Sequence, residues 1–261
     1  PDTGTIEVLG EQATRAANDR VGYLPEERGL YKKMTVRQLL AYYGTLKGMS
    51  GRDARREGDL WLERLGLASA AKNKVETLSK GMAQKVQFIA TVITRPELII
   101  LDEPFSGLDP VNLEALRTAI LELNRDGTTV IFSTHDMAMA ESMCDSVFMI
   151  FRGQKVLDGT MEEIQRDYGA DTVHLRMSGG RELLEGHPSV ETISDLGQIQ
   201  EVRLAGDPQQ LLRDLVQRTE LQHFELTKPS LHDIFVRIAG PEAVAAAAAD
   251  ASGVLLSTEG A

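Results

Sequence analysis

The sequence predicts an α/β fold with a parallel sheet, followed by a small α+β domain, and three observations support this. Residues 98–101 read LIIL, an apolar run without alternation that is typical of a strand buried on both faces of a parallel sheet. A helical pattern over 111–124 and a second such strand over 129–133 follow, and strand, helix, strand is the parallel crossover unit. Beyond residue 158 alternating strands and short amphipathic helices replace the buried runs.

The composition excludes several classes of protein. The 261 residues include 28 Lys and Arg against 39 Asp and Glu, a formal net charge of −11, so the surface repels nucleic acid and no nucleic-acid partner is expected. The single cysteine, Cys144, cannot form an internal disulfide, and no Cys/His spacing resembles a zinc site. No run of about 20 apolar residues is present, so the chain alone is not expected to span a bilayer.

The first elements are expected to form a helical subdomain over 34–95, inside a first domain at 1–165. Thr35 is a good N-cap for one of its helices, and Ser79 stands at the start of another. The expected strands and helices of this region lie at 6–8, 20–24, 35–48, 53–65 and 79–96.

A second parallel crossover is expected through a helix over 137–143 into a strand over 147–151. The following α+β domain is expected over 171–239, where Asp207 caps and Pro208 opens its central helix. Residues 240–261 are Ala-rich and are expected to form a tail without a tertiary role. The other expected elements lie at 161–167, 173–177, 200–204, 221–226 and 231–238.

Two adjacent carboxylates end the strand at 98–101. Ligands bind at the carboxyl edge of an α/β sheet, so Asp102 is placed to hold Mg²⁺ and Glu103 to polarise an attacking water. The alternative is an ordinary acidic turn after a strand.

Two further candidate sites lie at a helix start and at the next strand end. Ser79, Lys80, Gly81 and Met82 begin a helix whose free N–H groups favour an anion, although a plain N-cap explains the serine equally well. His135 follows the strand at 129–133 and could orient a water or reach a phosphate; the alternative is a hydrogen-bonded loop histidine.

Taken together, these motifs resemble those of the ATP-binding cassette (ABC) ATPases. LSKGM is similar to the family's signature LSGGQ, LIILDEP to its Walker B strand, SGLD to its D-loop and STHD to its switch-histidine loop. Glu26 stands at the Q-loop position. The stretch 171–239 is similar to the appendage of bacterial exporter-type cassettes, including sodium-efflux systems. The motifs lie at 78–82, 98–104, 106–109, 133–136 and 22–31.

The resemblance implies a P-loop NTPase-like parallel sheet that binds ATP and Mg²⁺. Asp102 and Glu26 would organise Mg²⁺, Glu103 would position the water, and His135 would sense the γ-phosphate.

The resemblance also implies a head-to-tail homodimer, or a heterodimer with a second ABC ATPase subunit. Ser79, Lys80, Gly81 and Met82 would contact the ATP held by the partner, and Asp109 would communicate across the dimer. A separate transmembrane permease would bind the pair at the cytoplasmic, inner face of the plasma membrane.

The sequence departs from the family pattern in three places. It contains no G-x-x-x-x-G-K-[ST], so we expect that roughly fifty residues with the phosphate-binding loop precede Pro1, and that the chain as printed lacks activity. Glu26 replaces the usual Gln of the Q-loop. Lys80 and Met82 replace a glycine and the glutamine of the signature.

The expected function is therefore the ATP-binding and ATP-hydrolysing subunit of an ABC exporter. Two alternatives stay open: a non-catalytic or regulatory ABC-like module without the phosphate-binding loop, and a soluble ABC ATPase outside transport. The transported substrate is not encoded in these motifs, because the membrane subunit contacts the cargo.

Overall fold

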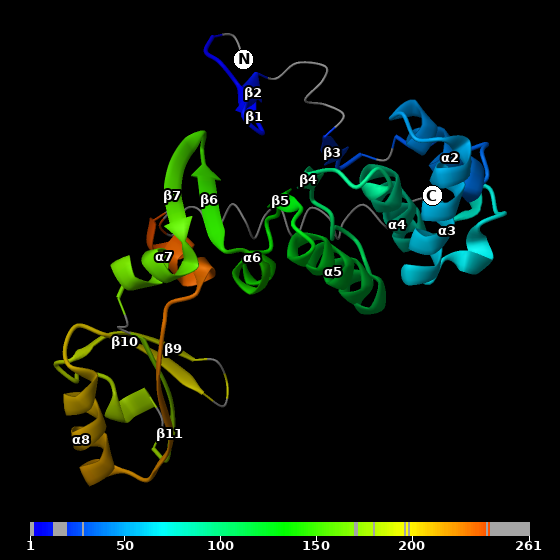
Figure 1. Cartoon of the computed structure of the whole chain (residues 1–261). Helices are drawn as coiled ribbons and strands as arrows, with labels where there is room; N and C mark the ends of the chain where they lie inside the picture. Colours follow the sequence, from blue (N-terminus) through cyan, green and yellow to red (C-terminus); the bar gives the residue numbers. More distant parts are fainter. Residues whose placement is uncertain are drawn as a thin grey trace, which may run out of the picture. The chain divides into compact units, whose positions relative to one another are not determined.

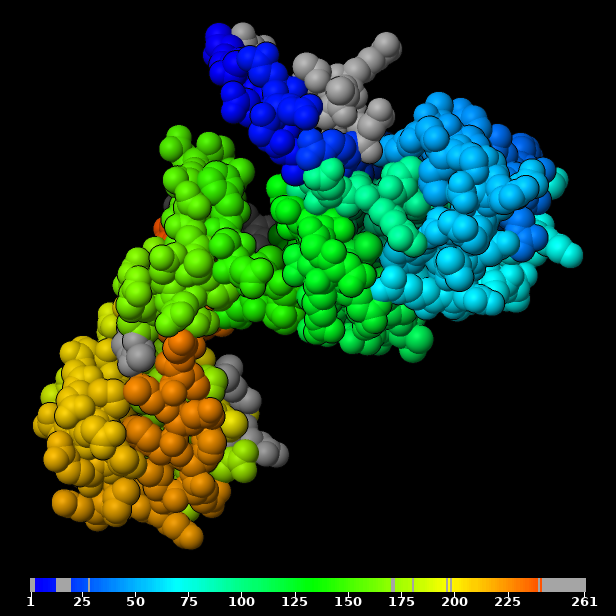
Figure 2. Space-filling view, in the orientation of Figure 1, coloured from blue at the N-terminus to red at the C-terminus, as the bar shows by residue number. Residues whose placement is uncertain are grey.

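The computed structural model describes residues 3–12, 20–27, 29–169, 172–179, 181–195, 197, 199–238 and 240. It divides into two compact units, residues 1–135 and 136–261, which are described separately (Figure 1, Figure 2). The expected tail at 240–261 lies outside the described residues except for Gly240. Among the described residues, no helix is both long enough and apolar enough to cross a bilayer.

The first unit contains the expected parallel sheet, in the order β3-β4-β5. Its strands are β3 (Val21–Leu24), β4 (Leu98–Asp102) and β5 (Thr129–Ser133), and all pairings are parallel. The central strand β4 is the most buried, with Ile99 and Leu101 fully inaccessible. Helix α5 (Pro110–Arg125) makes the crossover from β4 to β5. The buried run at 98–101 therefore predicted both strand and sheet type correctly.

Three helices lie within residues 34–95, the stretch expected to form a helical subdomain (Figure 1). They are α2 (Val36–Leu46), α3 (Gly51–Arg64) and α4 (Lys80–Val92). Thr35 caps α2 in a capping box with Gln38, Ser50 caps α3, and two short 3₁₀ turns connect α3 to α4. The interior is apolar, and Leu39, Leu62 and Phe88 are almost completely buried.

A small hairpin precedes this sheet. Strands β1 (Glu7–Val8) and β2 (Glu11–Gln12) pair antiparallel across Leu9 and Gly10, which both have positive φ, as a type I′ turn requires.

In the second unit, the expected second parallel crossover is wrong. After α6 (Met137–Met143), strand β6 (Ser146–Phe151) pairs antiparallel with β7 (Gln154–Thr160), and these two strands form a sheet of their own. The tight turn at Arg152 and Gly153, whose positive φ values of 51° and 73° suit a two-residue hairpin, accounts for the antiparallel pairing of β6 with β7. Strand β7 was not predicted from the sequence.

Helix α7 (Met161–Asp167) and the helical residues 231–238 pack on this hairpin. Leu157 of β7, Ile164 of α7, Leu231 and Ile234 form one buried apolar cluster. The last helix of the proposed 171–239 domain therefore shares its core with elements that precede that domain.

The remaining part of the second unit is a four-stranded antiparallel sheet in the order β11-β8-β10-β9, with α8 (Pro208–Arg218). Leu175, Val202, Leu211 and Leu215 belong to its buried core. Asp207 caps α8 as expected. The strands are β8 (Thr172–Met177), β9 (Val190–Asp195), β10 (Gln200–Leu204) and β11 (Leu221–Thr227), of which β9 was not predicted.

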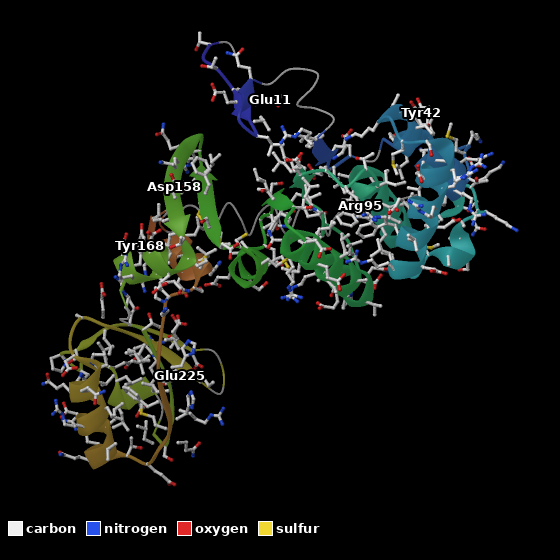
Figure 3. The ribbon with its side chains drawn as sticks, viewed as in Figure 1. Glu11, Tyr42, Arg95, Asp158, Tyr168 and Glu225 are labelled. Atoms are coloured by element: carbon white, nitrogen blue, oxygen red, sulfur yellow. The ribbon has the colours of Figure 1, made fainter. Side chains whose placement is uncertain are left out.

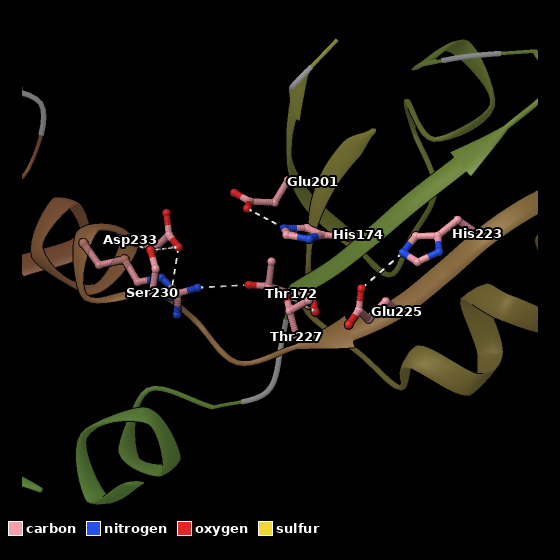
Figure 4. Close-up of polar contacts among 9 residues, drawn as sticks. Thr172, His174, Glu201, His223, Glu225, Thr227, Ser230 and Asp233 are labelled. Atoms are coloured by element: carbon pink, nitrogen blue, oxygen red, sulfur yellow. Dashed lines mark hydrogen bonds and ion pairs between the residues drawn. The ribbon is translucent and has the colours of Figure 1, made fainter. Parts of the chain in front are cut away.

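Side-chain hydrogen bonds join neighbouring strands of this sheet and cap the helix that follows it (Figure 4). The Thr227 hydroxyl donates to the Thr172 carbonyl at 3.3 Å, which joins β11 to the first residue of β8. The ring of His174 contacts Glu201 at 3.0 Å across the neighbouring strands β8 and β10. Ser230 and Asp233 hydrogen-bond to each other at the start of the last helix.

Candidate functional site

The two carboxylates at the end of β4 are tied to the end of β5. Asp102 and Ser133 are register partners, and the Ser133 hydroxyl donates to Asp102 Oδ1 at 2.5 Å. The Glu103 N–H donates to the same hydroxyl oxygen at 3.1 Å. Glu103 has a φ of 44°, a left-handed conformation that costs energy for a residue with a side chain. Ser133 therefore links both carboxylate residues; it begins the STHD motif, but it was not predicted as a site residue.

The Glu103 carboxylate is held by His135. The His135 backbone N–H donates to Glu103 Oε1 at 3.0 Å, and the ring Nδ1 lies 2.9 Å from the same oxygen. Because a carboxylate only accepts, we assign the proton of this contact to Nδ1. Only 19% of the Glu103 side chain is exposed, against 85% of the His135 side chain. The expected pair of strand-end groups is thus in direct contact.

The start of α4 is a capped helix N-terminus. The Ser79 hydroxyl accepts from the Met82 N–H at 3.2 Å. The Lys80 side chain lies directly over Gly107, where an added Cβ would overlap it. An added Cβ at Gly81 would lie 2.9 Å from Asn112 Nδ2, closer than a real Cβ contact allows. These contacts place the signature-like residues beside the loop at 106–109.

Asp109 caps the next helix, α5. Its Oδ1 accepts from the Val111 and Asn112 N–H groups at 3.1 and 3.0 Å, and its side chain also bonds that of Asn112. These bonds, the one from the Asn112 backbone first, lower the pKa of Asp109 below its ordinary value. Asn112 therefore contacts both Gly81 and Asp109, and it is a second residue that sequence reasoning missed.

Two buried glutamines of α4 hold the surrounding loops. Gln84 Nε2 donates to the Pro104 carbonyl at 3.2 Å, directly after Glu103. Gln87 Nε2 donates to the Pro25 carbonyl at 3.1 Å, directly before Glu26, which is itself exposed. The sequence contains a signal for both residues, since glutamine is unusual on the buried face of a helix and must find partners there.

The donor set fits magnesium that accompanies a nucleotide. Among the described residues, no three or more His, Cys, Asp or Glu side chains converge on a metal site. Magnesium is usually held by one or two carboxylates, with water and substrate phosphates completing its shell, so Asp102 at the end of β4 suits such an ion.

Comparisons with known proteins identify the family. The family model described as "ABC transporter" matches residues 1–106, and the model described as "ATP-binding protein DrrA1-3-like, C-terminal domain" matches residues 159–239. The ABC transporter ATP-binding protein YhaQ of Bacillus subtilis (strain 168) is 39% identical over 239 residues, covering 91% of this chain and 80% of YhaQ. The chain belongs to the ABC transporter ATP-binding protein family.

Two further ABC proteins are similar over most of the chain. The linearmycin resistance ATP-binding protein LnrL of Bacillus subtilis (strain 168) is 30% identical, covering 92% of this chain and 81% of LnrL. A solved structure of an ATP-binding subunit of an ABC transporter aligns with a TM-score of 0.60 and 31% identity, covering 65% of this chain and 72% of that chain.

These matches confirm the α/β fold of the P-loop NTPase type and the family resemblance seen in the motifs. ABC ATP-binding proteins bind ATP, generally with Mg²⁺, and generally act as ATPases together with a membrane permease.

Proposed function

We propose that the protein is the ATP-binding and ATP-hydrolysing subunit of an ABC export complex, powering a separate transmembrane permease. The observation that carries the proposal is the Glu103 carboxylate at the end of β4, which both the backbone and the ring of His135 hold within 3.0 Å. A general base needs a fixed position close to its water, and this arrangement provides one.

The proposed roles are those that the family resemblance implies, and the contacts around Glu103 support them. Asp102 and Glu26 would hold the Mg²⁺ that accompanies ATP, and this ion would neutralise charge on the phosphates. Glu103 accepts a proton from the attacking water at its carboxylate. Ser133 fixes the positions of Asp102 and Glu103 through its two hydrogen bonds. His135 orients Glu103 and is well exposed, which supports a role in sensing the γ-phosphate.

The residues at the start of α4 are proposed to act on ATP held by a second subunit. Ser79, Lys80, Gly81 and Met82 present a capped helix N-terminus, where N–H groups and the helix dipole favour a phosphate. Asp109 ends the loop at 106–109, which lies beside this helix start, and is proposed to communicate the state of the site to the second subunit of the dimer. The second subunit is another copy of this chain or a related ABC ATPase.

Export is supported by relatives that are named for resistance, such as LnrL, and by the C-terminal match at residues 159–239. The protein is proposed to act peripherally on the cytoplasmic face of the plasma membrane, through its permease.

The test uses a protein in which a phosphate-binding loop precedes Pro1. Glu103→Gln should still bind ATP, hydrolyse it orders of magnitude more slowly, and accumulate as a dimer in size-exclusion chromatography. Glu114→Gln, the same change on the exposed surface of α5, is the matched control and should hydrolyse normally. Turnover close to the starting protein in Glu103→Gln would refute the role of Glu103.

A further inference from the structure

Strand β11 is an edge of the four-stranded sheet in the second unit (Figure 1). It pairs with β8 on one side, and no strand pairs with its other side among the residues that the structure describes. Its register with β8 shifts once, between Leu221 and His223, so residues 223–227 form a regular edge. The seven-residue strand contains neither proline nor lysine, which often protect an edge strand from pairing. The backbone groups on its outer side can therefore pair with a further strand.

The charges on and beside β11 fit a second copy of the same strand. Phe224 is the central residue of β11, so two copies that pair antiparallel about Phe224 place residues at equal distances from it opposite each other. His223 then faces Glu225 of the second copy, and Glu220 faces Lys228. Both attractions occur twice, which is the self-complementarity that a two-fold interface requires.

The side chains that would meet are accessible. Glu220 and Lys228 are exposed and form no ion pair within the described part of the chain. His223 lies 3.2 Å from Glu225 in its own strand, and the two side chains are 43% and 60% exposed (Glu225 in Figure 3, both in Figure 4). Leu226, on the opposite face of the strand from Glu225, is 49% exposed and would be partly covered by the second strand.

The opposite edge of the sheet, β9, does not fit a second copy of itself. It carries Glu191 and Asp195 and no basic residue, so two copies of β9 would bring only like charges together. In a pair centred on Ile193, Glu191 would face Asp195 of the second copy. Of the two edges, β11 is therefore the one whose charges favour pairing with itself.

We propose that β11 is an interface between two copies of this chain, whose β11 strands pair antiparallel about Phe224 and join their two sheets. A strand of another protein would satisfy the same backbone groups, but it would give no reason for charges that mirror each other about Phe224. Two seven-residue strands bury less than the roughly 1,000 Å² of a stable interface, so the contact is weak by itself. It strengthens where two copies are already held together, as in the subunit pair proposed above.

The test is disulfide cross-linking of the 261-residue chain after Cys144, its single cysteine, is replaced by alanine. One batch carries His223→Cys, and a second batch with a different tag carries Glu225→Cys. Opposite residues of an antiparallel pair have Cα atoms about 4.5–5.5 Å apart, which suits a disulfide, whereas residue 223 and its own copy lie diagonally, about 7–8 Å apart. Under mild oxidation the mixture should form roughly fivefold more linked dimer than either batch alone. No ATP is added, so the result does not depend on the proposed function.

The matched control uses the other edge of the sheet with the same spacing. A batch with Thr192→Cys and a batch with Ser194→Cys, both exposed on β9, should link no better when mixed than alone. This control separates pairing at β11 from random collisions between exposed cysteines.

A charge exchange tests the register independently. Glu220→Lys in both batches of the β11 pair should lower the linked yield about threefold, because like charges then face each other at two places. Adding Lys228→Glu to both batches reverses both charges and should restore the yield. Glu162→Lys, the same change on the exposed surface of α7, should leave the yield unchanged.

Melting curves establish that each variant folds, and Gln222→Cys with Leu226→Cys, which also face each other in this register, replaces the first pair of variants if either unfolds. The proposal is overturned if the mixture links no better than the single batches, which is also the result expected if a permease strand rather than a second copy occupies β11. It is equally overturned if the β9 control links as well as β11, or if Lys228→Glu fails to recover the yield lost in Glu220→Lys.

Discussion

Removing the Ser133 hydroxyl should weaken the site at the end of β4 and the fold around it. The hydroxyl donates to Asp102 Oδ1 at 2.5 Å and accepts from the Glu103 N–H at 3.1 Å. A hydrogen bond to a charged group contributes about 1.5–3 kcal/mol, but Ser133 is exposed and water replaces part of the loss, so Ser133→Ala should cost about 1 kcal/mol. For a chain of this size that loss lowers the melting temperature by about 2–4 °C.

The same variant should hydrolyse ATP about tenfold more slowly when a phosphate-binding loop precedes Pro1, because the Asp102 and Glu103 carboxylates lose their shared anchor. Ser133→Thr is the matched control, since it keeps the hydroxyl and suits a strand, and it should restore both stability and turnover. The positioning role is refuted if Ser133→Ala melts and hydrolyses ATP like the parent. If Ser133→Thr loses as much stability and turnover as Ser133→Ala, the hydroxyl is not the cause of the loss.

Three further changes test other contacts. When a phosphate-binding loop precedes Pro1, Gly81→Ala forces a Cβ against Asn112 and should weaken ATP-dependent dimerisation, measured by size-exclusion chromatography, while Gly81→Ala/Asn112→Ala recovers it. Folding lowers the pKa of Asp109 below its ordinary value of 3.8. The ionised carboxylate therefore stabilises the fold above pH 3.8, and this stabilisation is lost as the pH falls through the lower pKa of the folded state. In Asp109→Ala the melting temperature should lack this part of its dependence on acid pH. Leu231→Ala should cost about 2–5 kcal/mol in its fully buried cluster, and hydrogen exchange should show faster opening of 231–238 and α7.

The buried elements of the first unit could be predicted because their apolar patterns fit few types of secondary structure, and the neighbouring residues decide between these types. A run such as 98–101, without alternation, fits only a strand covered on both faces or a buried helix, and its length and the following crossover decide for the strand. Caps such as Thr35 and Asp207 were equally clear, since a hydroxyl or carboxylate before an apolar periodic segment satisfies the free N–H groups of a helix start.

The second unit was harder to predict for a local reason. Strand β6 is apolar enough to look like part of a parallel sheet, and only the turn at Arg152 and Gly153 shows that the chain reverses into β7. Arginine seldom adopts a positive φ, and two-residue hairpin turns usually carry Asn, Asp or Gly at the first position. Arg152 before Gly153 therefore gave no sign of the turn in the sequence. Strand β9 was missed because its two apolar residues, Val190 and Ile193, lie three positions apart, so the sequence lacks the alternation that indicates a strand.

Within the candidate site, the motif residues were predictable and their supports were not. Glu103 and His135 were expected at neighbouring strand ends, and the structure places them in contact. Ser133 begins the STHD motif, but neither its hydroxyl nor the Asn112 amide carries a pattern that shows which group it bonds. Whether such groups support a site depends on the register of β4 with β5 and on the approach of α4 to α5, which only the tertiary structure fixes.

Helix α4 connects the parts of the site that the motifs treat separately. Its first residues follow the Ser79 cap, Gln84 binds the loop after Glu103, and Gln87 binds the loop that carries Glu26. An α-helix is stiff along its axis, and both glutamine side chains are buried, so neither loop can shift far without breaking a bond to α4 or displacing the helix start. A displacement at the exposed Glu26 loop would therefore also displace the start of α4, which is the helix end proposed to contact ATP held by a second subunit.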